Sequence, residues 1–294
     1  MRCLSLIAAA LVAALLAFAA CSNATQQANL NVPIAVVTTF STLNSFVEAV
    51  GGNRVRVHNL VPVGASPEEY LPSPQDVAAL ADAQLLVENG AGIETWLQRT
   101  IQNAGNAKLR VVVLSQGLRH IDANPHLWMD PVLARAYTNK VREALASLDP
   151  AHGAEYVRNT DAYKRQLETL QRDIAREIAT IPPRQRTMIV FHNAWQYYND
   201  RFGIRTVGVI ELSPGQEPNP KYIGDLVDLA RKYNVRAVFA EPEYSPKLAQ
   251  TLAKSAGIRT VTNLYDDSTG NDPRVRDYIS MLRYDTGVIV RALR

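Results

Sequence analysis

The sequence predicts an α/β protein of two lobes, each a mostly parallel sheet covered by helices, joined by one long rigid helix. Three observations predict this fold class. From Pro33 onward, short apolar runs alternate with helix-periodic segments, which is typical of parallel sheets with helices on both faces. The alternation occurs twice along the chain. Between the two series lies a long segment whose apolar residues fall on one face of a helix. If the chain has a ligand site, we expect it in the cleft between the lobes.

The bulk composition agrees with a folded protein of this size. The chain has 294 residues, of which 47% are hydrophobic and 20% are charged, and its formal net charge is +3. This is enough apolar sequence for one large domain or two of ordinary size, and the low charge argues against global disorder. No dense Lys/Arg block occurs, so we expect no nucleic-acid partner.

The N-terminus is typical of an export signal. Arg2 precedes an apolar run, which ends in small residues just before Cys21. The run is short for a membrane-spanning helix, and small residues before a cysteine fit a lipoprotein processing site. We therefore expect a signal peptide over 1–20, acylation of Cys21, and a flexible tether over 21–31. A plain signal peptide cleaved near Ala20, or an uncleaved anchor, is the alternative.

The cysteine content restricts the ligands that a metal site can use. The two cysteines are Cys3 and Cys21. Cys3 would leave with the signal peptide and Cys21 would carry lipid, so the mature fold would have neither a thiol nor a disulfide. Any metal site must then use His, Asp or Glu.

We expect an extracytoplasmic monomer, lipid-anchored on the periplasmic or cell-surface face of the membrane.

The two series of strands and helices define the two lobes. The N-terminal lobe, 32–149, has predicted strands at Ile34–Val37, Val55–Leu60, Ala83–Val87 and Leu109–Leu114, and helices near Leu43–Val50, Pro74–Ala81 and Ile93–Asn103. The C-terminal lobe, 182–294, has predicted strands at Thr187–Phe191, Arg205–Val209, Ala237–Ala240 and Thr260–Thr262, and helices near Asn219–Lys232, Pro246–Ser255 and Pro273–Ala292.

The segment 150–181 is predicted to be a single helix that links the lobes. Asp149 provides a cap, and Pro150 occupies the first helical position. About 30 residues at 1.5 Å each give a length of about 45 Å before Pro182 ends the helix. The alternative is an ordinary peripheral helix in a single domain. Apolar residues recur at the spacing of one helix face, at Tyr156, Tyr163, Leu167, Leu170, Ile174 and Ile178.

Four predicted loops carry side chains of the types that bind metal ions. Each follows the carboxyl end of a predicted strand, where open α/β sheets bind ligands. The four side chains are those of Glu68, His126, His192 and Asp267. Two imidazoles and two carboxylates form a complete set of ligands for a divalent transition-metal ion, and the two negative charges lower the cost of burying the ion. Two of the loops fall in each lobe, so an interlobe cleft can collect all four.

Each of these residues also has an ordinary interpretation. A lone histidine after a strand is more often a hydrogen-bonded loop residue than a ligand. Paired acids such as Glu68 with Glu69, or Asp266 with Asp267, are often solvated turn residues or helix caps. Of the other histidines, only His120 offers a spare ligand.

The four loops, in this order, resemble those of the zinc and manganese substrate-binding lipoproteins of ABC importers, the TroA-like family. The resemblance implies two lobes joined by one rigid helix with the metal between them. It also implies an ABC permease and a cytoplasmic ATPase as partners, and it matches the family's Asp ligand to Asp267 rather than Asp266. The similar segments are Val36–Ser41, Gly64–Pro74, Asn124–Pro131, His192–Tyr198, Ala240–Pro242, Leu264–Ser268 and Met281–Tyr284.

The first ligand loop departs from the family's pattern. It usually reads Asp-Pro-His, whereas here it reads Ser66-Pro67-Glu68. Carboxylates can bind bidentately and raise the coordination number, so this set favours manganese or iron, although raw affinity favours zinc over manganese. Zinc-specific members often carry a His- and acid-rich loop in the first lobe, and the segment 115–124 contains only His120 and one Asp.

We therefore expect a binding protein rather than an enzyme, which takes one Mn²⁺, Zn²⁺ or Fe²⁺ ion per chain. Four protein ligands leave no position reserved for an activated water. The alternatives are a secreted metallohydrolase, with Glu69 or Glu241 as its base, and a surface adhesin. The sequence has neither an HExxH helix nor a Gly-x-Ser-x-Gly elbow.

Overall fold

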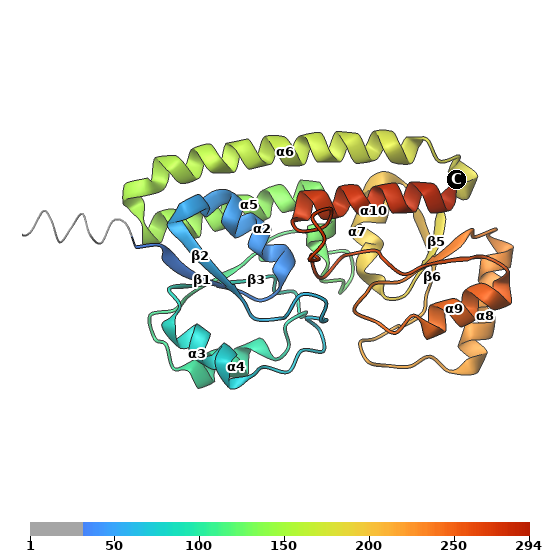
Figure 1. Cartoon of the computed structure of the whole chain (residues 1–294), viewed down its shortest axis with the longest axis horizontal. Helices are drawn as coiled ribbons and strands as arrows, with labels where there is room; N and C mark the ends of the chain where they lie inside the picture. The colour runs from blue at the N-terminus through green and yellow to red at the C-terminus, as the bar shows by residue number, and fades with distance from the viewer. Residues whose placement is uncertain (1–31) are drawn as a thin grey trace, which may run out of the picture.

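The computed structural model describes residues 32–294, which form two lobes beneath one long helix (Figure 1). The expected signal peptide, Cys21 and the tether lie outside the described residues. Each lobe is built on a four-stranded parallel sheet with helices on both faces, so the predicted fold class is confirmed. Within residues 32–294, no helix combines the length and the apolarity needed to cross a bilayer.

The first sheet has the strand order β2-β1-β3-β4, and all its pairings are parallel. Helix α2 lies on the side of the sheet that faces the long helix, whereas α3 and α4 cover the other side (Figure 1). The elements are β1 (Ile34–Thr38), α2 (Ser41–Gly51), η1 (Gly52–Arg54), β2 (Val55–Asn59), α3 (Pro74–Asp82), β3 (Leu85–Glu88), α4 (Leu97–Ala104) and β4 (Arg110–Val113).

The second sheet repeats this topology with the order β6-β5-β7-β8. The shared order means that both sheets place their second strand at an edge and their first strand inside. The elements are η4 (Pro183–Gln185), β5 (Thr187–Val190), η5 (Asn193–Trp195), α7 (Gln196–Phe202), β6 (Arg205–Val209), α8 (Pro220–Lys232), β7 (Ala237–Phe239), α9 (Lys247–Ala256), β8 (Arg259–Val261) and α10 (Tyr278–Leu293).

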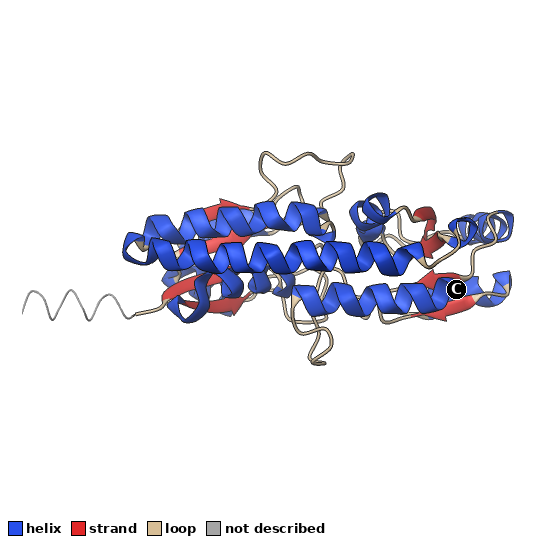
Figure 2. Cartoon of the chain, turned by 90° about the horizontal axis from the view of Figure 1, so that it is seen from above, coloured by secondary structure: helices blue, strands red, loops and turns tan. Residues whose placement is uncertain are grey.

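The linking helix α6 (Gly153–Ala179) has 27 residues, and is therefore about 40 Å long. Every residue of the predicted apolar stripe is buried. The α-helix begins later than predicted because Pro150 opens the short turn η3 (Pro150–His152), and Asp149 accepts hydrogen bonds from Tyr156 and pairs with His152. Helix α6 lies alongside α5 (Pro131–Leu148) and α10 (Figure 2).

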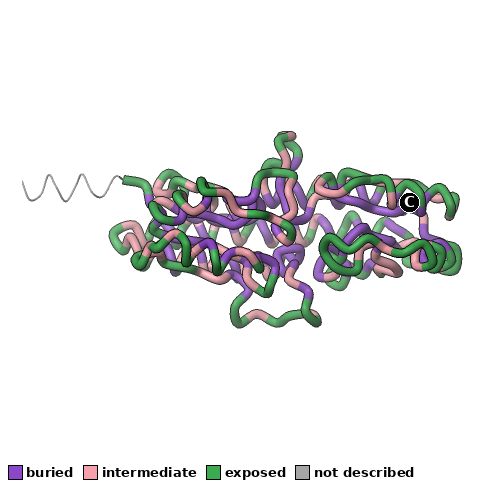
Figure 3. Tube along the Cα trace, turned by 90° about the horizontal axis from the view of Figure 1, so that it is seen from below, coloured by how far each residue is buried: buried purple, intermediate pink, exposed green. Residues whose placement is uncertain are grey.

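The strands alternate their side chains between two cores. On β1, Val36 faces a core shared by both lobes, whereas Val37 faces a core under α3 and α4. On β5, Met188 and Val190 face the shared core and Ile189 faces a core under α8 and α9. The shared core also takes in the buried face of α6, and buried segments lie in the interior of both lobes (Figure 3). The lobes are thus joined by packing as well as by covalent connection.

Two helices, α5 and α7, are absent from the sequence-based prediction. Asp130 caps α5 by accepting a hydrogen bond from the backbone N–H of Val132, and Pro131 occupies its first position. This is a standard helix start, but it lies inside the segment that we interpret as a ligand loop. Helix α4 begins at Leu97 rather than near Ile93, and it follows a turn at residues 90–92 that has three successive positive φ angles.

Candidate metal centre

The four predicted ligand residues come together between the two sheets. Glu68 lies in the loop after β2, and Ser73 ends that loop by capping α3 as predicted. His126 lies in the loop after β4, directly before the short turn η2 (Leu127–Met129). His192 follows β5 and precedes η5. Asp267 lies in the loop after β8, so all four residues follow the carboxyl ends of strands.

The distances among these side chains fit a single small ion. Glu68, His126 and His192 each offer one ligand atom, and these atoms lie within 4.8 Å of one another. The carboxylate of Asp267 reaches both imidazoles, with Oδ1 3.4 Å from Nε2 of His126 and Oδ2 3.8 Å from Nε2 of His192. Ligands about 2.0–2.1 Å from a tetrahedral ion are about 3.3 Å apart, so these spacings need little adjustment to bind one.

The hydrogen bonds of the site leave its central atoms without partners. Among residues 32–294, no hydrogen bond reaches Nε2 of His126, either ring nitrogen of His192 or either carboxylate oxygen of Asp267, although all are buried. Buried polar atoms are normally paired. His126 Nδ1 lies 2.9 Å from Oδ1 of Asn124, which leaves the Nε2 lone pair directed at a carboxylate. A cation between these atoms satisfies them all.

The charges of the site shift three pKa values. Burial, and secondly the charge of Asp267, raises the pKa of Glu68 above its ordinary value. Burial alone lowers the pKa of His192, but Asp266, Glu241 and Asp267 together raise it well above its ordinary value. Burial raises the pKa of Asp267, but the nearby imidazoles of His126 and His192 bring it below its ordinary value.

A second group of acids lies behind His192. Nδ1 of His192 is 3.4 Å from Oε2 of Glu241 and 3.9 Å from Oδ2 of Asp266, and Trp195 Nε1 donates to Oε1 of Glu241 at 3.2 Å. Burial, with a smaller contribution from Asp267, raises the pKa of Glu243 to about 8. A carboxylate at the second nitrogen of a histidine ligand orients the ring and strengthens it as a donor.

Sequence reasoning gives no role at this site to Glu243, and names Glu241 only within a segment that resembles the family and as a base of the alternative hydrolase. The position of both glutamates in the sequence does indicate a place at this site. The two glutamates follow the carboxyl end of β7 (Ala237–Phe239), which is the same position that the four predicted ligands occupy relative to their strands.

The loop that carries Asp267 is anchored on the first lobe. Oγ1 of Thr42 donates to the carbonyl of Asp267 at 3.1 Å, and Nε1 of Trp128 donates to the carbonyl of Asp266 at 2.9 Å. Two more hydrogen bonds of 2.9 Å join the lobes here, from Gly64 N to Ser268 Oγ and from Thr269 N to Ser41 Oγ. The backbone beside Asp267 is therefore held by the lobe that carries Glu68 and His126.

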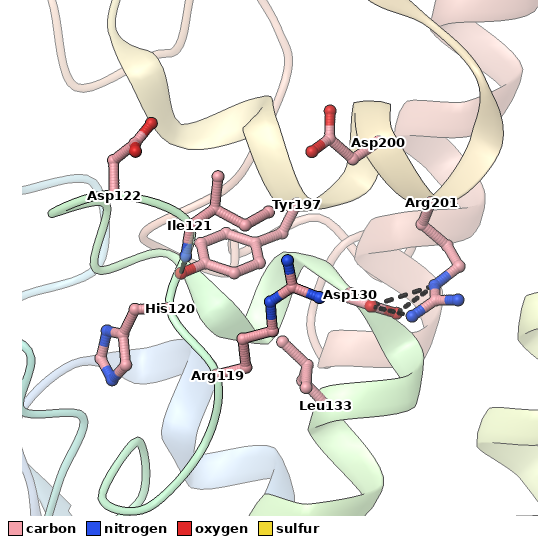
Figure 4. A pocket seen from close by; sticks show the side chains of 9 residues that line it. All are labelled: Arg119, His120, Ile121, Asp122, Asp130, Leu133, Tyr197, Asp200 and Arg201. Atoms are coloured by element: carbon pink, nitrogen blue, oxygen red, sulfur yellow. Dashed lines mark hydrogen bonds and ion pairs between the residues drawn. The ribbon is translucent and has the colours of Figure 1, made fainter.

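The spare histidine, His120, does not join this site. It lines a separate cavity of about 490 Å³ on the side of the lobe junction (Figure 4). Across that cavity, the guanidinium of Arg201 binds the carboxylate of Asp130 through both Nε, at 3.0 Å, and an Nη, at 2.7 Å. The two groups of metal-type ligands found among the described residues do not include His120.

Comparison with known proteins places this geometry in a family. Residues 36–292 match the family model of ZnuA, zinc-uptake complex component A, periplasmic. The manganese-binding lipoprotein MntA of Halalkalibacterium halodurans is 32% identical over 263 residues, which cover 88% of this chain and 88% of that protein. The iron-binding protein YfeA of Yersinia pestis is 28% identical over 264 residues, with coverage of 87% and 85%.

Solved structures agree with this assignment. A crystal structure of ZnuA matches with a TM-score of 0.81 at 29% identity, over 89% of this chain and 100% of that one. The periplasmic zinc-binding protein TroA of Treponema pallidum, at 24% identity, has the same fold with a TM-score of 0.81 over 89% of this chain and 99% of that one. The resemblance inferred from the loops is confirmed, and the chain belongs to the ZnuA family of periplasmic substrate-binding proteins.

Proposed function

We propose that the chain binds one divalent transition-metal ion through Glu68, His126, His192 and Asp267, and delivers it to the permease of an ABC importer driven by a cytoplasmic ATPase. The convergence of buried, unpaired imidazole and carboxylate atoms on one point carries this proposal. As a member of its family, the chain is an extracytoplasmic solute-binding protein of an ABC importer for divalent metal ions, and not an enzyme. Acylation of Cys21 would hold it at the membrane.

The packing of the lobes supports a mechanism of small movements. The shared core runs through α6 into both lobes, and the Asp267 loop is bonded to the first lobe. Glu68, His126 and Asp267 would then keep their arrangement while His192 moves with the second sheet. Loss of one ligand from four is a short route to release, because it opens the ion to water and to the permease without unfolding either lobe.

Binding of the ion should release protons, and this tests the proposal. The raised pKa of His192 favours its imidazolium form in the metal-free protein, and that form must lose a proton to coordinate the ion. Affinity should therefore rise with pH, about tenfold per unit for each proton released, until the pH exceeds that pKa. Isothermal titration at pH 7 in two buffers of different ionisation enthalpy should give one ion per chain and at least one proton released. Binding that is independent of pH and buffer would contradict the assignment of His192.

We propose that Glu68 tunes the choice of metal towards Mn²⁺ or Fe²⁺ over Zn²⁺. Replacing it in Glu68→His should raise the ratio of Zn²⁺ to Mn²⁺ affinity by at least about tenfold, because imidazole suits zinc and carboxylate suits manganese. Competition between the two ions on the purified chain measures this ratio. Glu69→His is the matched control, because Glu69 is exposed and adjacent. Equal shifts in both variants would count against a role for Glu68.

A further inference from the structure

The side chain of Asn124 is buried at the junction of the lobes and uses both ends of its amide. Its Oδ1 accepts a hydrogen bond from the backbone N–H of His126 at 3.0 Å and lies 2.9 Å from Nδ1 of the same residue. Its Nδ2 donates to the carbonyl of Asn193 at 2.6 Å and to Oε1 of Gln196 at 3.2 Å. The amide oxygen faces donors and the amide nitrogen faces acceptors, so both ends agree on one orientation.

This orientation decides which nitrogen of His126 is free. An amide oxygen only accepts hydrogen bonds, so the proton of the neutral imidazole must be on Nδ1. Nε2 then carries the lone pair, and it is the nitrogen that faces Oδ1 of Asp267 at 3.4 Å. Partners that fix the tautomer of a metal-binding histidine typically affect metal affinity by about 10–100-fold.

The same amide connects the two histidines across the lobes. Asn193, whose carbonyl holds Nδ2 of Asn124, directly follows His192 on η5. The loop is tied to the second lobe once more by Tyr197, which lies beside Ile121 (Figure 4). The Tyr197 hydroxyl donates to the carbonyl of Asn124 at 2.9 Å and accepts from the backbone N–H of Ile121 at 3.0 Å. A movement of η5 away from the first lobe removes the acceptors that hold the amide.

We propose that Asn124 is a positioning residue that fixes the tautomer of His126 and makes it depend on contact between the lobes. The inference rests on the proposed role of His126 as a ligand. With the lobes together, the amide is held at both ends and Nε2 is presented to the ion. With the lobes apart, Nδ2 loses both acceptors and the amide is held only by the backbone N–H of His126, so the position of Oδ1 at Nδ1 is less well fixed and the hold on the ion weakens. Asn124 thus couples the affinity of the first lobe to the position of the second.

Two substitutions distinguish the contribution of the amide oxygen of Asn124 from that of its amide nitrogen. Asn124→Ala removes both, and should lower Zn²⁺ affinity by about 10–100-fold and abolish the exchange-protected Nδ1–H resonance of His126 in ¹⁵N NMR spectra of the zinc-loaded protein. Asn124→Asp keeps an oxygen acceptor for Nδ1 but loses the donor to Asn193 and Gln196. It should restore the Nδ1–H resonance while zinc still dissociates about tenfold faster than from the wild type.

The control is Asn106→Ala, because Asn106 also donates from Nδ2 to two carbonyls, those of Leu80 and Ala83, but lies away from the site. It should change neither the resonance nor the affinity. Unchanged affinity and resonance in Asn124→Ala would overturn the inference, and full restoration of slow dissociation by Asn124→Asp would overturn its interlobe part. Absence of zinc binding by the wild-type chain would instead overturn the proposed function itself.

Discussion

Replacing Asp267 by alanine should abolish tight metal binding and leave the fold intact. Its carboxylate is 1% exposed and is the group that reaches Nε2 of both histidines. Without it, two neutral imidazoles and one carboxylate face a divalent ion in a buried site, and the charge of the ion is only half compensated. The loss should exceed the roughly 100-fold that is the upper range for removing a residue that only orients a ligand. Competition with a chromophoric chelator measures the affinity.

Two other aspartates in the same loop region make this prediction specific. Asp272 is paired with Arg274 at the surface, and Asp272→Ala should bind metal like the wild type. Asp266 precedes Asp267, but its carboxylate lies on the Nδ1 side of His192, so Asp266→Ala should weaken binding less than Asp267→Ala. If Asp266→Ala loses the metal and Asp267→Ala keeps it, the ligand assignment is wrong.

Trp128→Ala should be among the most destabilising substitutions in the first lobe. The side chain is fully buried, with its ring centroid 4.9 Å from that of Phe40 and 5.1 Å from that of His126. Truncating a buried aromatic residue to alanine costs about 3–5 kcal/mol of unfolding free energy. The carbonyl of Asp266 would also lose the closer of its two donors and keep only Oγ1 of Thr42, at 3.4 Å, which adds about 1 kcal/mol. Urea denaturation of the metal-free protein measures the sum.

Trp128→Phe divides that cost into its two parts. It keeps an aromatic ring in the core but removes the indole N–H, so it should lose about 1 kcal/mol for the hydrogen bond together with some packing. Trp96 provides a second comparison, because it is only half-buried at the edge of the shared core and its Nε1 donates to the carbonyl of Pro67 rather than to the Asp267 loop. A loss below about 1 kcal/mol in Trp128→Ala would mean that Trp128 does not hold the Asp267 loop in place.

Local patterns of the sequence are enough to predict most of the fold. The strand Arg205–Val209 is observed with its predicted bounds, and the apolar stripe of α6 is buried throughout. Periodicity and helix caps act over a few residues, so a single sequence contains them. The start signal of α5 is equally local, in Asp130 and Pro131, but the same two residues also end the segment that resembles a ligand loop, and this hides the helix start.

The long-range arrangement of the site could not be predicted in this way. Strand ends indicate which loops meet, and they bring Glu68, His126, His192 and Asp267 together as expected. They do not indicate that Asp267 is held by Thr42, 225 residues away in the sequence. They also do not show that the amide of Asn124 joins two lobes, because its partners lie 69 and 72 residues further along the chain.

The most direct test of the proposed site is anomalous diffraction from crystals of the metal-loaded protein, recorded at the absorption edge of the bound ion. We predict one peak per chain, within bonding distance of a carboxylate oxygen of Glu68, Nε2 of His126, Nε2 of His192 and a carboxylate oxygen of Asp267. A peak bound instead to Nδ1 of His192 with Glu241 and Asp266, or one in the lateral cavity beside His120, would contradict the account.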